Sequence, residues 1–145
     1  MSDGQFVYGP NVAGFDLSAF LNGHGSPLQA YLNDIDAWAR YSTVNPKVLL
    51  AVLELRFGYV TADSLPDRDQ VLLDIEHTAM DLAVAFYEHL YTWGSRRPAF
   101  SLRSYLLNPT VAFADGSTAQ ITRQVPSGGF AVAAALAQSS ELPQW

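Results

Sequence analysis

The segment Asn45–Gly58 constrains the fold more than any other part of the chain. Asn45 can cap a helix by accepting a hydrogen bond from a free backbone N–H group of the first turn, and Pro46 fits the first helical position, where no donor is needed. Gly58 can adopt the left-handed conformation that ends a helix. The apolar side chains between these signals cover most of the helix circumference: Val48, Leu49, Val52, Leu53, Leu55 and Phe57. Such a helix belongs in the centre of a domain, with other helices packed around it.

Apolar residues at helical spacing and capping signals predict further helices on both sides of this segment. We expect them over the ranges Leu17–Leu21, Pro27–Tyr41, Asp69–Trp93, Phe100–Leu107 and Phe130–Gln138. The period changes in Val111–Ile121, where Asp115-Gly116 predicts the type I′ turn of a small hairpin. The predicted fold class is therefore mainly α, with five or six helices around a central buried helix and one small β-hairpin.

The length of 145 residues predicts a single domain over 1–145. Residues 1–14 are rich in Gly and Asn and predict an extended lead-in segment. Residues 139–145 have no periodicity and predict a tail or linker. The start Met1–Gly4 looks artificial, and we expect that a signal peptide of the natural protein is absent from this sequence.

The net charge of −6 limits the classes of partner. An acidic surface repels phosphate backbones and anionic headgroups, so we expect neither nucleic acid nor membrane as a partner, but a basic protein. No apolar run is long enough to span a bilayer. The chain has no cysteine, which excludes disulfides and thiolate metal sites.

Glu54 is the one candidate for a catalytic acid, because burial in an apolar helix would raise its pKa. It lies seven residues after Lys47, however, so both share the polar stripe of the helix, where solvation is expected. Arg56 falls on the apolar side in the last turn. There its stem can cover the core while its head reaches a carbonyl or an acid.

The histidines predict no metal site. His77 and Asp81 are four residues apart on a polar face, but the zinc-peptidase pattern needs a second histidine there, and a solvated face is expected. His89 lies on the apolar stripe and is expected to be a hydrogen-bonded core or interface residue. His24 stands between two glycines and is expected to be exposed. From site chemistry alone, the sequence predicts no enzyme and no cofactor.

The stretch from Val44 to Tyr59 resembles the catalytic helix of lysozyme-like lytic transglycosylases in its Asn-Pro start, its Leu-Leu-Ala centre and its Gly-Tyr end. That alignment places Arg56 at the position of the catalytic glutamate. A guanidinium group cannot protonate a glycosidic oxygen at neutral pH. This resemblance implies a distantly lysozyme-like fold that lacks its acid.

A closer resemblance is to the pro-regions of secreted zinc endopeptidases of the beta-lytic and staphylolysin type, which cleave peptidoglycan cross-bridges. The similar stretches are Phe6–Pro10, Gly14–Leu21, Trp38–Glu54 and Ala112–Thr118. The chain does not contain the combined set of His-x-x-x-Asp and His-x-His zinc ligands that the mature peptidases carry. The resemblance therefore implies a non-catalytic pro-part of a bacterial extracellular or periplasmic precursor, with zinc only in the partner peptidase.

The function implied is that of a folding chaperone and inhibitor, present as a monomer or in a 1:1 complex with its peptidase. Loops can enter a substrate groove, so the candidate contacts are His24, Asp63 in the loop Tyr59–Asp69, and the hairpin tip Asp115-Gly116. Two alternatives stay open. One is an inactive lysozyme-like module that binds peptidoglycan, and the other is a lytic transglycosylase that uses Glu54.

Overall fold

The computed structural model describes residues 1–94, 110–112, 118–120 and 126–139. This part of the chain is mainly helical, which confirms the predicted fold class. Six α-helices, two 3₁₀ segments and two short strands make up the described elements: α1 (Asp3–Phe6), η1 (Pro10–Val12), α2 (Leu17–Gly23), η2 (Pro27–Tyr31), α3 (Leu32–Tyr41), α4 (Pro46–Phe57), α5 (Arg68–Gly94), β1 (Thr110–Ala112), β2 (Thr118–Gln120) and α6 (Ser127–Ser139).

Helix α4 is the central helix that the sequence predicts. The Asn45 side chain accepts a hydrogen bond from the backbone N–H of Lys47 at 3.0 Å, and Gly58 ends the helix with φ of 70°. Helices α3, α5 and α6 all pack against α4. They do not enclose it completely, because Leu55 is 67% exposed and Phe57 is also exposed. The expectation that these two side chains belong to the buried surface was wrong.

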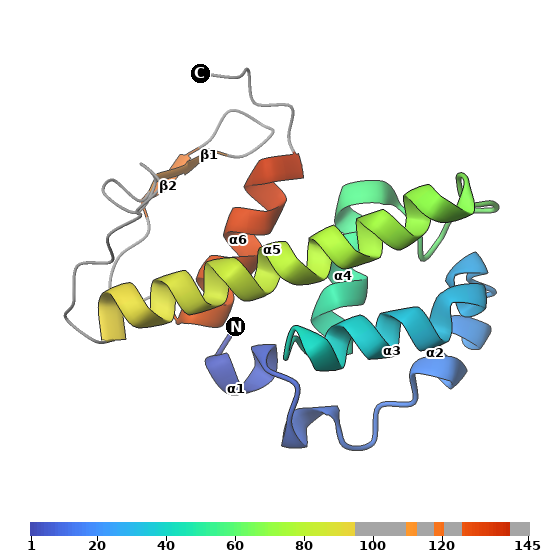
Figure 1. The fold of residues 1–145 in the computed structure, drawn as a ribbon, viewed down its shortest axis with the longest axis horizontal. Helices are drawn as coiled ribbons and strands as arrows, with labels where there is room; N and C mark the ends of the chain where they lie inside the picture. Colours follow the sequence, from blue (N-terminus) through green and yellow to red (C-terminus); the bar gives the residue numbers. More distant parts are fainter. Residues whose placement is uncertain (95–109, 113–117, 121–125, 140–145) are drawn as a thin grey trace.

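Helix α5 is the longest element and spans the molecule, and α4 and α6 cross it (Figure 1). Its observed ends lie within one residue of the predicted range. Ile75, Ala79 and Leu82 of the predicted stripe are fully buried against the neighbouring helices. Leu90 is exposed, so the stripe turns away from the core in the last turns of the helix.

The predicted helix over residues 27–41 consists of two parts. It begins as the 3₁₀ segment η2, where the Ser26 hydroxyl accepts a hydrogen bond from the backbone N–H of Leu28, and continues as α3. The shorter helix α2 extends two residues beyond its predicted end and has the predicted cap, because the Asp16 carboxylate accepts from the backbone N–H of Ala19 at 2.8 Å.

The N-terminal residues are not an extended lead-in, as the sequence had suggested. They form α1 and η1, and Phe6 is 1% exposed and stacks on Phe86 with ring centroids 4.7 Å apart. The Asp3 carboxylate also accepts a hydrogen bond from the backbone N–H of Gly128, at the start of α6. A Cβ atom at Gly128 would lie 2.5 Å from the Cβ of Phe6, so the close approach of these two segments depends on glycine. Burial of one aromatic ring thus fixes a segment whose composition looked flexible.

Strands β1 and β2 are antiparallel, with Val111 opposite Ala119. The predicted turn at Asp115-Gly116 lies outside the described residues, and so do the predicted helix Phe100–Leu107 and residues 140–145 of the predicted tail. Helix α6 begins three residues before its predicted start. Within the described ranges, none of the helices combines the length and hydrophobicity of a membrane span.

Candidate functional site

Glu54 lies at the end of α4, where its carboxylate organises the turn that follows. One carboxylate oxygen accepts from the backbone N–H of Val60 at 2.7 Å and of Thr61 at 3.2 Å, and the other accepts from the Thr61 hydroxyl at 2.6 Å. These hydrogen bonds favour the charged form, chiefly the one from the Thr61 hydroxyl, and hold the pKa of Glu54 below its usual value.

A catalytic general acid needs the opposite environment. It must hold its proton near neutral pH, which requires burial or a neighbouring carboxylate that raises its pKa. The half-buried Glu54 is instead an ionised acceptor with three donors. This geometry opposes the alternative in which Glu54 protonates a glycosidic oxygen.

Arg56 has the environment that the sequence predicts for it. Its side chain is 13% exposed, and one guanidinium nitrogen lies 3.2 Å from the Asp81 carboxylate and 3.2 Å from the Thr78 hydroxyl. Both partners belong to α5, so Arg56 ties the end of α4 to the long helix. Asp81 is engaged in this contact, and His77 is exposed on the surface.

A second polar contact joins the residues after α4 to α5. The Tyr59 hydroxyl donates to the Asp74 carboxylate at 2.6 Å, and the Gln70 amide donates to the other oxygen of Asp74 at 2.9 Å. Burial and the hydrogen bond to Asp74 raise the pKa of Tyr59. Tyr59 and Val60 are buried, so the loop Tyr59–Asp69 begins in the core and not on the surface as expected.

His89 is the buried interface histidine that the sequence predicts. Its ring is 3% exposed, stacks on Phe130 of α6 at 4.7 Å, and has Nδ1 2.9 Å from the Ser127 hydroxyl. Burial lowers the pKa of His89, and the charge of Asp3 opposes this effect. Across the described residues, no group of three His, Cys, Asp or Glu side chains is arranged to hold a metal ion.

Only two of the predicted partner contacts, His24 and Asp63, lie within the described residues. His24 is exposed at the end of α2, where its ring packs on Phe20 and its Nδ1 lies 2.8 Å from the Phe20 carbonyl oxygen. Asp63 is exposed in the loop before α5. Asp115 and Gly116 lie outside the described residues. Their role in partner binding stays a prediction.

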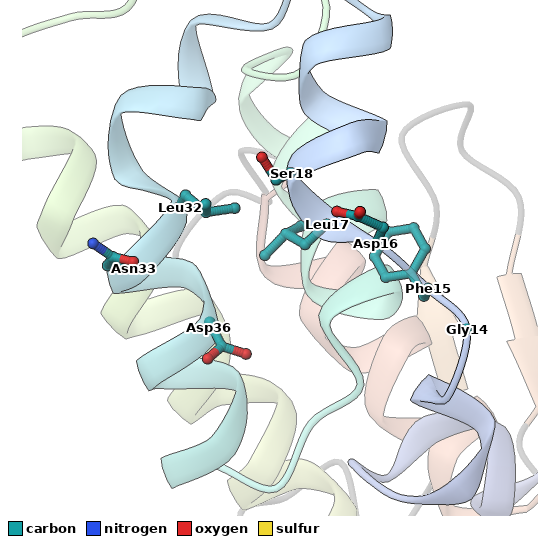
Figure 2. Close-up of a pocket in the computed structure, with 8 residues that line it drawn as sticks. All are labelled: Gly14, Phe15, Asp16, Leu17, Ser18, Leu32, Asn33 and Asp36. Carbon is teal, nitrogen blue, oxygen red and sulfur yellow. The ribbon is translucent and has the colours of Figure 1, made fainter.

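A cavity of about 530 Å³, lined by both polar and apolar residues, lies between α2 and α3 (Figure 2). Leu17 and Leu32 face each other across it, and the carboxylates of Asp16 and Asp36 lie near its edges. Both carboxylates already have partners, because Asp16 caps α2 and Asp36 forms an ion pair with Arg40 at 2.8 Å. The cavity therefore offers no unused pair of acids for catalysis.

A second, apolar cavity of about 510 Å³, which the sequence did not predict, lies between the end of α3 and the second half of α5. We call it the tyrosine groove, and its lining residues are Tyr41, Ser42, Thr43, Met80, Ala83, Val84, Tyr87, Glu88 and Tyr91. Tyr41 is 74% and Tyr91 62% exposed. The spacing of Val84, Tyr87 and Tyr91 on one helix face was the available signal, but only the folded chain brings Tyr41 beside them.

Comparison with known proteins identifies one family model and two relatives that match this chain. The family model described as "LasA, N-terminal domain" matches residues 1–145. Protease LasA of Pseudomonas aeruginosa strain PAO1 is 33% identical over 58 residues, which are 40% of this chain and 14% of that protein, and Protease LasA of strain UCBPP-PA14 gives the same values. The match thus spans about a seventh of the length of these relatives. No solved structure matches, so the predicted relation to lysozyme-like folds stays a prediction.

Proposed function

The chain belongs to the LasA N-terminal domain family, and from this premise we propose that it is the pro-domain of a secreted, peptidoglycan-degrading zinc endopeptidase. In this role it assists folding of the peptidase domain and keeps it inactive until the two are separated. The observation that carries the proposal is the family match over residues 1–145. The name of the curated relatives, Protease LasA, supports a protease as the partner.

The chemistry of the described residues supports a non-catalytic role for this domain within the precursor. Glu54, the one acid that the sequence suggests as a catalytic residue, is held in its charged form by three donors. The chain supplies no cysteine ligand, and its described residues offer no cluster for zinc. Zinc belongs, in this proposal, to the partner peptidase.

The charge of the chain supports a basic protein partner. With a net charge of −6, the domain attracts a cationic surface over a distance of about a Debye length and speeds encounter with it. Inhibition needs, in addition, a segment that covers the substrate groove or the zinc ion. The exposed His24 and Asp63 can reach a groove, and Asp115-Gly116 is the third candidate from the sequence.

The test is a titration of this protein into the zinc endopeptidase while a glycine-bridge peptide is hydrolysed. We expect stoichiometric loss of peptidase activity at a 1:1 ratio. A parallel assay with cell wall and no peptidase checks the alternatives: lysis would support a transglycosylase, and retention on the wall without inhibition would support a peptidoglycan-binding module. Either result without peptidase inhibition would refute the inhibitor role.

The chaperone role needs its own measurement. Denatured peptidase domain should recover activity after dilution and removal of the pro-domain only if the pro-domain was present during refolding. Equal recovery in its absence would contradict assistance in folding and leave inhibition unaffected.

The predicted contact residues are tested with the single variants His24→Ala, Asp63→Ala and Asp115→Ala, of which at least one should weaken inhibition.

A further inference from the structure

We propose that the tyrosine groove is the surface on which the peptidase domain docks, and that its occupant is an arginine or lysine side chain of that domain. This inference rests on the proposed function for the identity of the partner. It rests on the groove itself for the chemistry of the contact. Of the contact residues expected from the sequence, the two that the structure describes, His24 and Asp63, do not line this groove.

Several large apolar side chains around the groove are exposed in one place. Tyr41 and Tyr91 are mostly exposed, and Val84 and Tyr87 are also exposed. Singly exposed apolar residues are ordinary, but a contiguous aromatic patch around a cavity is typical of a protein-binding site. Tyrosine suits such a site because it offers a large rigid surface with a polar end.

Thr43, on the wall of the groove, has a strained backbone conformation. Thr43 has φ of 58°, and within the described ranges it is the one residue other than glycine with positive φ. A β-branched residue adopts this conformation only where its surroundings impose it. Here the Thr43 hydroxyl lies 2.9 Å from the Tyr87 hydroxyl, and the Thr43 carbonyl accepts from the backbone N–H of Tyr8 at 2.7 Å. These contacts hold the groove in one shape before any partner arrives.

The charge and the aromatic character of the groove lining favour a cationic occupant. Among the residues that the structure describes, the groove lining contains no Lys, Arg or His and includes three tyrosines and Glu88. The face of an aromatic ring attracts cations, and the aliphatic stem of arginine or lysine packs well on apolar walls. Tyr87 and Tyr91 present nearly parallel rings, with centroids 6.1 Å apart and an angle of 22° between their planes. A cationic side chain with an apolar stem is thus the best match to this lining.

The net charge of the whole chain argues against a second copy of this chain as the occupant. A second copy of this chain also carries a net charge of −6, so self-association must overcome repulsion between like charges. The peptidase domain has a further advantage within a common precursor, because covalent attachment raises its effective concentration at the groove. The relatives are several times longer than the part that matches, so they have room for such a domain.

The experiment compares four variants of this protein for binding to, and inhibition of, the peptidase domain. Tyr41→Ala combined with Tyr91→Ala removes two exposed rings, and we expect the dissociation constant to rise about thirtyfold, as for truncated aromatic anchors elsewhere. The control combines Leu55→Ala with Leu73→Ala, two exposed apolar side chains that do not line the groove. It should bind like the unchanged protein. Thermal unfolding of each variant checks that the fold is retained.

The last two variants test the sign of the occupant's charge at one exposed position on α5. Val84→Lys should weaken binding about tenfold, whereas Val84→Glu should leave it unchanged or strengthen it. Equal losses in both variants would overturn the cationic occupant.

The results separate the failure of this inference from that of the proposed function. If the unchanged protein neither binds nor inhibits the peptidase, both are wrong. If it inhibits and the double tyrosine variant inhibits equally well, the docking surface is wrong and the pro-domain function stands. If the tyrosine variant instead loses concentration-dependent self-association, with peptidase binding intact, the groove joins two copies of the chain and the inference is likewise wrong.

Discussion

Replacing Glu54 should destabilise the domain without removing any catalytic activity. The Glu54→Ala variant loses the acceptor for two backbone N–H groups and one hydroxyl in the turn after α4. The Glu54→Gln variant keeps one acceptor oxygen and places an amide donor where the other oxygen accepted. The two variants therefore remove the contact to different degrees while α4 keeps a good helix-forming residue.

The expected size follows from the number and exposure of these hydrogen bonds. A hydrogen bond to a charged group contributes about 1.5–3 kcal/mol when it is buried, but Glu54 is only half-buried, and water can replace it at the exposed donors. We expect a loss of about 1–2 kcal/mol for Glu54→Ala and about half of that for Glu54→Gln. For a domain of this size, a loss of 1 kcal/mol lowers the melting temperature by about 2–6 °C.

The pH dependence gives an independent check of the same contact. The pKa of Glu54 is lowered in the folded state, so the unfolded chain binds the proton more tightly at acidic pH. The contribution of Glu54 is then complete above the unfolded pKa, near 4.3, and is lost as the pH falls through the folded pKa. The stability difference between the unchanged protein and Glu54→Gln should shrink over this acidic range.

Urea unfolding of the three proteins at pH 7 and at several acidic values measures this difference, and a muramidase assay on cell wall accompanies it. Two results would refute the reasoning. One is wall lysis by the unchanged protein that disappears in Glu54→Gln, because it would make Glu54 a catalytic acid. The other is a Glu54→Ala variant as stable as the unchanged protein, because the three hydrogen bonds would then contribute nothing.

Three further changes test the packing around the N-terminus and the groove. Thr43→Val keeps the strained backbone but loses the hydroxyl contact, and should lower the free energy of unfolding by about 1 kcal/mol. Thr43→Gly relieves the strain and should stay within about 1 kcal/mol of the unchanged protein. A Gly variant less stable than the Val variant in urea unfolding would contradict this. Gly128→Ala forces a Cβ against Phe6 and should cost about 1–3 kcal/mol, while the control Gly23→Ala has open space and should be neutral in thermal unfolding. Burial lowers the pKa of His89, so the unfolded chain takes up the proton at a higher pH than the folded protein does. Stability should therefore fall as the pH drops below about 6.5 and through the folded pKa. The melting temperature of His89→Gln should depend less on pH over that range.

The sequence predicts those parts of the fold that local chemistry decides. The cap at Asn45 and the end at Gly58 are correct to the residue, because both depend on groups within one helical turn. The ends of α5 lie within one residue of the predicted range, because helix periodicity and the signals at its ends are also local in sequence. The buried position of His89 also follows from helix periodicity alone.

The errors occur where contacts distant in sequence decide. The segment around Phe6 looked extended because its glycines and asparagines have no helical period, yet its ring is buried against α5. Leu55 looked buried because a helical wheel shows which side is apolar but not whether a neighbour covers it. The tyrosine groove was not predicted for both reasons: Tyr41 and Tyr87 are far apart in sequence, and no neighbouring segment within the described residues buries their side chains.

The contact between the two ends of the described chain bears on the proposed chaperone role. Asp3 and Gly128 are joined across 125 residues, and one continuous core extends from Phe6 in α1 to Ala135 in α6. A contact of such high sequence separation closes only after the helices between its ends have assembled, since the loop entropy is lost before the contact can compensate for it. Once closed, it holds α1, α5 and α6 as one packed unit. A pro-domain that guides the folding of another domain must present a rigid surface of this kind. If the proposed chaperone role is correct, the groove on α5 has its shape before the peptidase domain has acquired its own.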